Sequence, residues 1–174
     1  MNIGVFDMKT RFLFLFLSIL PFSGFSQTRE THLSQCDSLG ICPDFKFYNL
    51  QGQVFNRDSL QKGMHRIVLI YFSTSCEFCL SEFKIIKKNM AQFSKTSFIL
   101  ISTEETADLR KYDSLRQFAY FPQIRIVQDK NHLYHKYFTA HYTPSVHIYD
   151  KKGKLLHFSD GKMTKEELTG YLEK

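Results

Sequence analysis

The clearest structural pattern in this sequence is Ile67-Val68-Leu69-Ile70-Tyr71-Phe72-Ser73-Thr74-Ser75-Cys76-Glu77-Phe78-Cys79. Its first six residues are continuously apolar, which is typical of a strand that is buried on both faces of a sheet. After Cys76 the apolar residues recur mostly at intervals of three and four, the period of an amphipathic helix. These residues are Phe78, Cys79, Phe83, Ile86, Met90 and Phe93. The stretch therefore predicts a buried strand followed by a helix that begins at two cysteines.

Strand and helix patterns alternate along the rest of the chain. Further strands are predicted at residues 44–48, 54–55, 97–102, 123–128, 145–150 and 155–159, and further helices at 107–118, 131–138 and from Thr164 to the end. Thr164 and Glu167 have the spacing of a capping box, and Gly153 lies in the turn of a predicted hairpin. This alternation predicts an α/β fold in which helices cover both faces of a sheet.

The composition is that of an ordinary globular protein. The chain has 174 residues, of which 43% are hydrophobic and 23% are charged, and this excludes a disordered, collagen-like or coiled-coil chain. The formal net charge of +6 is spread along the chain without a long basic run, so nucleic-acid binding is not indicated. Four cysteines are too few for a disulfide scaffold, but they suffice for one redox pair or one metal site.

The N-terminal residues have the pattern of a secretory signal peptide. Lys9 and Arg11 precede the apolar run 12–20, and the small-residue site 24–26 follows it. An uncleaved membrane anchor is the alternative, although the apolar run is short for a membrane span. We therefore expect a periplasmic or secreted protein whose four cysteines meet an oxidising compartment. The predicted organisation is a signal peptide (1–26), a leader (27–39) and a single domain (40–174).

The two cysteines after the buried strand are the main candidates for chemistry. At the helix N-terminus, free backbone N–H groups and the helix dipole stabilise a thiolate at Cys76. Cys79 lies one turn deeper, so Cys76 is expected to attack a partner's disulfide and Cys79 to resolve the mixed disulfide. Three other hypotheses remain open: a zinc site completed by Cys36 and Cys42, a structural disulfide, and an unreactive pair of core cysteines.

The chain resembles the thioredoxin-like superfamily, and within it the secreted TlpA/ResA-like thiol–disulfide oxidoreductases. The matching segments are Gly40-Ile41-Cys42-Pro43-Asp44-Phe45, residues 71–79, Glu82, Tyr142-Thr143-Pro144-Ser145 with the following strand and hairpin, and Gly161. The resemblance covers residues 40–171, nearly all of the expected domain. It implies a thioredoxin-like fold, with a central mixed β-sheet, helices on both faces, an N-terminal β-hairpin and a central insertion between Cys76 and Pro144.

The resemblance also implies a function. It makes Cys76 and Cys79 the catalytic pair of a reductant that needs no cofactor and no metal. A cis bond before Pro144 would bring the backbone groups of Thr143 beside Cys76, where they bind an extended substrate segment. The implied partners are thiols or disulfides of exported proteins and a membrane electron donor. We also expect the protein to be a monomer.

Several residues depart from the family pattern. Ile70 stands where thioredoxins keep a buried Asp that moves protons to the second cysteine. Phe78 replaces the usual motif proline, and Ser75 replaces the usual Trp. Lys84 stands where many relatives have a helix-kinking Pro. Glu77, at the helix start, is expected to modulate the pKa of the first thiol, with a proton-shuttle role as the alternative. These departures leave the reduction potential and the redox direction open.

The other two cysteines lie on the segment that leads into the first strand. Cys36 and Cys42 are six positions apart, and in an oxidising compartment we expect them to form a local structural disulfide. The functional alternative is a second redox pair that relays electrons to Cys76, and two free thiols or an intermolecular bridge are the remaining alternatives.

Histidines and acidic residues elsewhere give weaker signals. His132 and His135 would share a helix face, but Asp129 is the only nearby carboxylate, so we expect surface histidines instead of a metal site. His147, on the strand after Pro144, is expected to pack in the core. The adjacent pair Glu104-Glu105 is expected to lie in a loop or at a helix start, because neighbouring residues do not face each other.

Two other functions are compatible with this type of fold. A peroxiredoxin-like peroxidase shares the Pro-Asp-Phe segment, but its catalytic cysteine follows a Thr by three residues, and here Ser73 holds that position. A copper- or zinc-binding chaperone would need a histidine, His141 or His147, near the thiols. Peroxide consumption favours the first function, and tight metal binding without insulin reduction favours the second.

Overall fold

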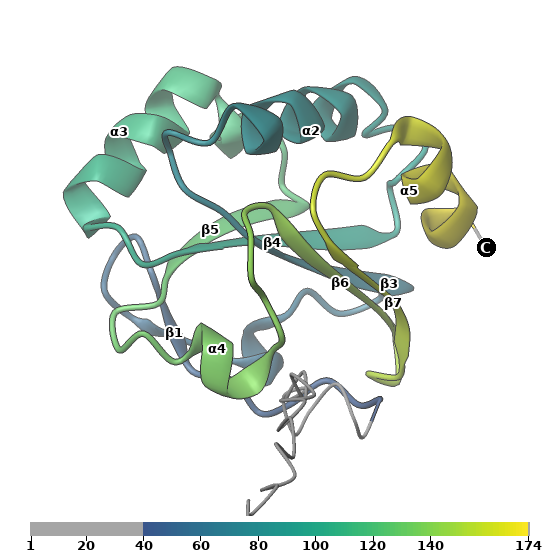
Figure 1. Ribbon diagram of the computed structural model, residues 1–174, viewed down its shortest axis with the longest axis horizontal. Coiled ribbons are helices and arrows are strands. Elements are labelled where there is room, and N and C mark those ends of the chain that lie inside the picture. Colours follow the sequence, from purple (N-terminus) through teal and green to yellow (C-terminus); the bar gives the residue numbers. More distant parts are fainter. Residues whose placement is uncertain (1–39, 174) are drawn as a thin grey trace, which may run out of the picture. The chain divides into compact units, whose positions relative to one another are not determined.

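The computed structural model describes residues 40–173, and within them a mixed β-sheet of seven strands forms the centre (Figure 1). The strands are β1 (Phe47–Asn49), β2 (Val54–Phe55), β3 (Arg66–Tyr71), β4 (Thr96–Ser102), β5 (Ile124–Gln128), β6 (Ser145–Asp150) and β7 (Leu155–Asp160). Their spatial order is β2-β1-β5-β4-β3-β6-β7. β3, β4 and β5 are parallel, whereas all other neighbours pair antiparallel.

Helices cover both faces of this sheet, as predicted. They are α2 (Glu77–Lys88), α3 (Thr106–Arg116), α4 (Tyr134–Tyr137) and α5 (Lys165–Leu172), with 3-10 turns η1 (Arg57–Ser59) and η2 (Phe118–Tyr120). In Figure 1, α2, α3 and α5 lie over one face, and α4 lies on the other. The capping box of α5 is confirmed, because Thr164 Oγ1 accepts the Glu167 N–H and the Glu167 carboxylate accepts the Thr164 N–H.

The side chains of β3 alternate between two hydrophobic cores. Val68 and Ile70 belong to the core beneath α2, α3 and α5, and Ile67 and Leu69 belong to the core on the α4 side, together with Tyr134. All of these side chains are buried. Cover on both faces explains why this strand is continuously apolar in sequence.

Two predicted elements differ from the observed ones. The first strand is β1, at Phe47–Asn49, and not residues 44–48. The helix expected at 131–138 is a single turn, α4, because His132 adopts a left-handed φ of 52° and the Asp129 carboxylate accepts the N–H groups of Leu133 and Tyr134 at 2.9 and 2.7 Å. His132 therefore does not share a helix face with His135.

The segment between β4 and α4 is the predicted central insertion. It contributes α3 and β5, and β5 pairs with β4 on one edge and with β1 on the other. The predicted signal peptide (1–26) and leader (27–39) lie outside the described residues. Within residues 40–173, no helix has the length and apolar character needed to cross a membrane.

Candidate active site

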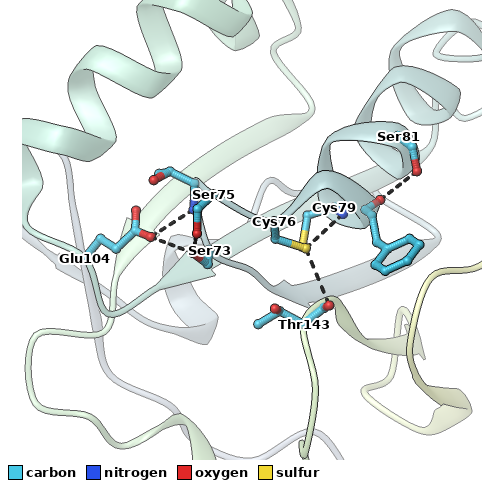
Figure 2. The surroundings of a disulfide bond; sticks show 9 residues. Ser73, Ser75, Cys76, Cys79, Ser81, Glu104 and Thr143 are labelled. Carbon is cyan, nitrogen blue, oxygen red and sulfur yellow. Dashed lines mark hydrogen bonds between the residues drawn. A yellow bond between two sulfur atoms is a disulfide. The ribbon is translucent and has the colours of Figure 1, made fainter.

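A short loop connects β3 to α2 and carries Cys76 at the N-cap of the helix (Figure 2). Cys76 and Cys79 form a disulfide, with their Cα atoms 5.3 Å apart. The Cys79 N–H also donates to Cys76 Sγ at 3.0 Å, so this sulfur replaces the usual capping oxygen. Cys76 is partly buried and Cys79 is fully buried, which confirms the predicted difference in exposure.

The sheet register brings a second loop beside the disulfide. β6 pairs antiparallel with β3, and Ser145 lies opposite Tyr71, so the residues just before β6 adjoin the loop just after β3. The Thr143–Pro144 peptide bond in that loop is cis, as the resemblance implied. The Thr143 carbonyl oxygen lies 3.5 Å from Cys76 Sγ, as Figure 2 shows, and in the dithiol form the Cys76 thiol can donate to it.

Glu104 holds the loop that precedes Cys76. Its Oε1 atom accepts the Ser73 hydroxyl and the Thr74 N–H, each at 2.9 Å (Figure 2). Glu104 follows β4, which is parallel to β3, so both chain segments leave the sheet at the same edge. The sequence predicts only that Glu104 lies in a loop or at a helix start, and it does not reveal this role. The signal that could have found it is a carboxylate just after the strand next to the cysteine strand.

Glu82 is a buried carboxyl group on the same face of α2 as Cys79. The two residues are separated by one helical turn, and neither is exposed. Burial raises the pKa of Glu82 to about 8, and this effect exceeds the opposing influence of the Met163 backbone and of the Lys162 charge. The side chain is therefore mostly protonated at neutral pH. The sequence showed only that Glu82 matches a family position, although its spacing after Cys79 already places it on the buried face.

The remaining predicted site residues lie in different environments. Glu77 is the first residue of α2 and is exposed. Cys42 is buried, and its N–H donates to the Gly153 carbonyl at 2.7 Å. Cys36 lies outside the described residues, so the Cys36–Cys42 disulfide stays a prediction. In residues 40–173, no three His, Cys, Asp or Glu side chains are grouped so that they could hold a metal ion.

Histidines and aromatic residues complete the surroundings. His147 is buried among aromatic rings, with Nδ1 3.2 Å from the Tyr134 hydroxyl, which confirms its expected packing role.

Two aromatic side chains next to the reactive loops are exposed: Phe78 to 67% and Tyr142 to 70%. Phe78 lies inside the cysteine motif, and Tyr142 directly precedes Thr143, so apolar surface lies next to the disulfide.

The geometry agrees with a comparison of the sequence with known families. The sequence model of the AhpC/TSA family matches residues 40–158, a range that contains both cysteines of the disulfide and the Thr143–Pro144 loop. The chain belongs to the AhpC/TSA family. A search among curated proteins finds no match.

Solved structures share the fold of this AhpC/TSA-family protein. A secreted disulfide oxidoreductase of Mycobacterium tuberculosis, homologous to E. coli DsbE, is 22% identical with a TM-score of 0.60, over 74% of this chain and 94% of that chain. A thiol:disulfide interchange protein of the thioredoxin family from Chlorobium tepidum is 17% identical with a TM-score of 0.58, over 76% and 93%. A thiol peroxidase from Chromobacterium violaceum is 12% identical with a TM-score of 0.63, over 76% and 83%.

These likenesses show that the AhpC/TSA-family protein has a thioredoxin-like fold. The expected fold class is thereby confirmed, including the mixed sheet, the N-terminal hairpin and the insertion. Family membership and fold together support thiol–disulfide oxidoreductase activity.

Proposed function

We propose that the chain is an exported thiol–disulfide oxidoreductase that reduces disulfides in other exported proteins. The observation that carries the proposal is the position of Cys76 Sγ, at the N-terminus of α2 and 3.5 Å from the Thr143 carbonyl oxygen. A reactive sulfur thereby lies beside the backbone of Thr143. An extended partner segment can bind along this backbone, which we call the Thr143 edge. The greater exposure of Cys76 supports its role as the attacking thiol, with Cys79 as the resolving thiol.

The proposed reaction starts from the dithiol form. The Cys76 thiolate attacks one sulfur of the partner's disulfide, a new S–S bond forms, and the partner's other sulfur leaves as a thiolate. The Cys79 thiolate then attacks Cys76 Sγ, forms the Cys76–Cys79 disulfide and releases the second partner sulfur. Two electrons pass from the cysteine pair to the partner, and the two thiol protons end on the partner's sulfurs.

Local charges favour the thiolate at Cys76. The Cys79 N–H points at Cys76 Sγ, and the N-terminus of α2 carries a partial positive charge. Glu77 places a negative charge in the same turn and opposes this stabilisation. In this proposal Glu77 limits how far the pKa of Cys76 falls, which is the modulating role expected from the sequence.

In this proposal Glu82 exchanges a proton with Cys79. Ile70 leaves no titratable side chain at the position where thioredoxins use an Asp, and Glu82 lies on the buried face of α2, one turn beyond Cys79. A carboxyl group with a pKa of about 8 is close to neutral pH, where general acid–base catalysis is most efficient. In the proposed cycle, the ionised form of Glu82 accepts the Cys79 proton as the resolving thiolate forms.

Export is supported by the signal pattern before residue 27 and by a secreted protein of the same fold. A reductant in that location needs electrons from outside its own chain. We therefore include a membrane-bound electron donor in the proposal. Its other two parts are exported proteins as partners and a monomeric working state.

The reduction potential of the Cys76–Cys79 pair tests this proposal. The protein is equilibrated in dithiothreitol or glutathione buffers, oxidation is read by mass, and Cys36→Ser with Cys42→Ser isolates the pair. A potential near that of thioredoxin, about −270 mV, together with reduction of insulin disulfides, is the expected result. A value near about −120 mV would instead indicate an oxidant that installs disulfides. Failure to form the disulfide at any potential contradicts the proposal.

A second candidate function is a peroxidase, which the thiol peroxidase among the fold neighbours favours. The Ser73 hydroxyl stands three residues before Cys76, but it donates to Glu104 Oε1 at 2.9 Å. Its proton thus points to the carboxylate and away from the space beside Cys76. This arrangement favours disulfide exchange over peroxide reduction as the function. Peroxide consumption by the reduced protein, measured beside insulin reduction, distinguishes the two functions.

A further inference from the structure

Asp160, the last residue of β7, binds the loop that precedes Pro144 through a cluster of hydrogen bonds. Its carboxylate accepts the His141 N–H at 3.1 Å (Oδ1) and 3.0 Å (Oδ2), and the Tyr142 N–H at 3.1 Å (Oδ1). His141 Nδ1 lies 2.7 Å from Oδ2 of the same carboxylate. The Asp160 side chain is only 17% exposed, so these contacts are partly shielded from water.

The position of Asp160 follows from strand register. β6 and β7 are antiparallel neighbours, and Ser145 lies directly opposite Asp160. The carboxylate therefore adjoins the backbone just before Ser145, which is the loop that contains Thr143 and the cis peptide bond. The loop is connected to the reactive sulfur, because the Thr143 carbonyl oxygen is 3.5 Å from Cys76 Sγ.

We propose that Asp160 is a positioning residue of the disulfide-exchange site: by fixing the backbone of His141 and Tyr142, it holds the Thr143 edge in register with Cys76 for binding of a protein partner. This inference rests on the proposed function, because it assigns Asp160 to partner binding in that reaction. A carboxylate that accepts two consecutive backbone N–H groups restricts the loop more strongly than a single neutral hydrogen bond would.

The turn after Asp160 gives the same segment a second contact with the site. Gly161 has a φ of +147°, a conformation that other residues rarely adopt, and the Ser159 hydroxyl donates to its carbonyl at 3.1 Å. The chain then brings the Met163 backbone beside the buried Glu82 carboxyl. One short segment, 160–163, thus contacts both the partner-binding loop and the acid next to Cys79.

A positioning role and a purely structural role predict different kinetics. A structural role lowers the folded fraction and reduces the rate with every substrate equally. A positioning role matters only for a partner that binds along the Thr143 edge, because a small disulfide reacts with Cys76 without that edge. The ratio of kcat/KM for a protein disulfide to kcat/KM for a small disulfide separates the two roles, since the folded fraction cancels.

The experiment compares Asp160→Ala, Asp160→Asn and Asp150→Ala in the full chain. Asp150, at the other end of the β6–β7 hairpin, is a matched control, because its carboxylate also accepts two backbone N–H groups, from Lys152 at 2.8 Å and Lys154 at 2.9 Å. Each variant is assayed with insulin and with 5,5′-dithiobis(2-nitrobenzoate), and its KM and kcat are measured separately.

We expect Asp160→Ala to raise KM for insulin about tenfold, because the hydrogen bonds that fix the backbone of His141 and Tyr142 are all lost together, with the small-disulfide rate changed by less than about twofold. Asp160→Asn keeps an acceptor for the backbone N–H groups, so its KM should lie between those of wild type and Asp160→Ala. The proposal is overturned if Asp160→Ala affects both substrates equally or neither, or if Asp150→Ala gives the same selective effect. A wild-type protein that reduces neither substrate refutes the proposed function itself and this inference with it.

Discussion

Replacing Glu82 by Gln tests the buried carboxyl group that the proposed proton transfer requires. Gln has nearly the same size as Glu but does not titrate, so the substitution removes a proton-binding site and leaves the packing of α2 in place. Glu82 is fully buried, and its pKa is raised from 4.5 to about 8 by burial. The consequence appears in how stability depends on pH.

The sign follows from proton binding in the two states. Between pH 4.5 and 8, Glu82 is protonated in the folded protein and ionised in the unfolded chain, so the folded state binds more protons and the free energy of unfolding falls as the pH rises. At 1.36 kcal/mol for each pKa unit, wild type should lose about 3 kcal/mol from this group between about pH 5 and pH 7.5. The Gln variant lacks this loss.

Urea unfolding of the oxidised protein at both pH values measures the effect. At pH 5 the buried amide should make the variant about 1–3 kcal/mol less stable than wild type. This cost does not change with pH, so the wild-type loss of about 3 kcal/mol should cancel or reverse the difference by pH 7.5, and the change between the two pH values is the informative quantity. Glu77→Gln is the matched control, because Glu77 is exposed on the first turn of the same helix. Parallel pH dependences for wild type and Glu82→Gln would refute the argument that burial keeps Glu82 protonated.

Three further substitutions test the packing and the loops around the site by chemical unfolding. Phe83→Ala should lower the free energy of unfolding by about 3–5 kcal/mol, because Phe83 is only 2% exposed. Phe78→Ala should lower it by less than about 0.5 kcal/mol, because Phe78 is exposed. Similar losses in the two variants would contradict the assignment of Phe83 to the core. Glu104→Ala should lower the free energy of unfolding by about 1–3 kcal/mol, since it leaves the Ser73 hydroxyl and the Thr74 N–H without their acceptor. Glu105→Ala is the control, and equal stability of the two variants would argue against this contact. Thr164→Ala should cost about 1 kcal/mol through loss of the α5 cap, and no change would mean that the capping box contributes nothing.

Local sequence patterns predicted most of the fold because the main elements have clear periods. The apolar run in β3 and the change of period at Cys76 correctly indicated a buried strand followed by a helix. Predictions failed where a single side chain or backbone angle ended an element. At 131–138, the Asp129 carboxylate and the left-handed His132 limit α4 to one turn, and neither effect has a periodic signature.

The candidate site was predicted only as far as its residues are neighbours in sequence or match a family motif. The Cys76–Cys79 spacing indicated the disulfide directly. Glu104 and Asp160 were missed because their contacts join segments far apart in sequence, and only the strand register brings them beside the two loops. Glu82 is an intermediate case: the sequence matched it only to a family position, although its spacing after Cys79 fits the buried face of α2, and neither signal could show how far burial raises its pKa.

Trapping of a mixed disulfide shows directly whether Cys76 attacks a partner's disulfide and Cys79 resolves the product. Reduced full-length Cys79→Ser protein is mixed with oxidised insulin, and the adduct is located by peptide mass mapping. We predict one stable adduct per chain, on Cys76, and none in the Cys76→Ser variant. An adduct on Cys42, or equal trapping in Cys76→Ser and Cys79→Ser, would contradict these roles of Cys76 and Cys79.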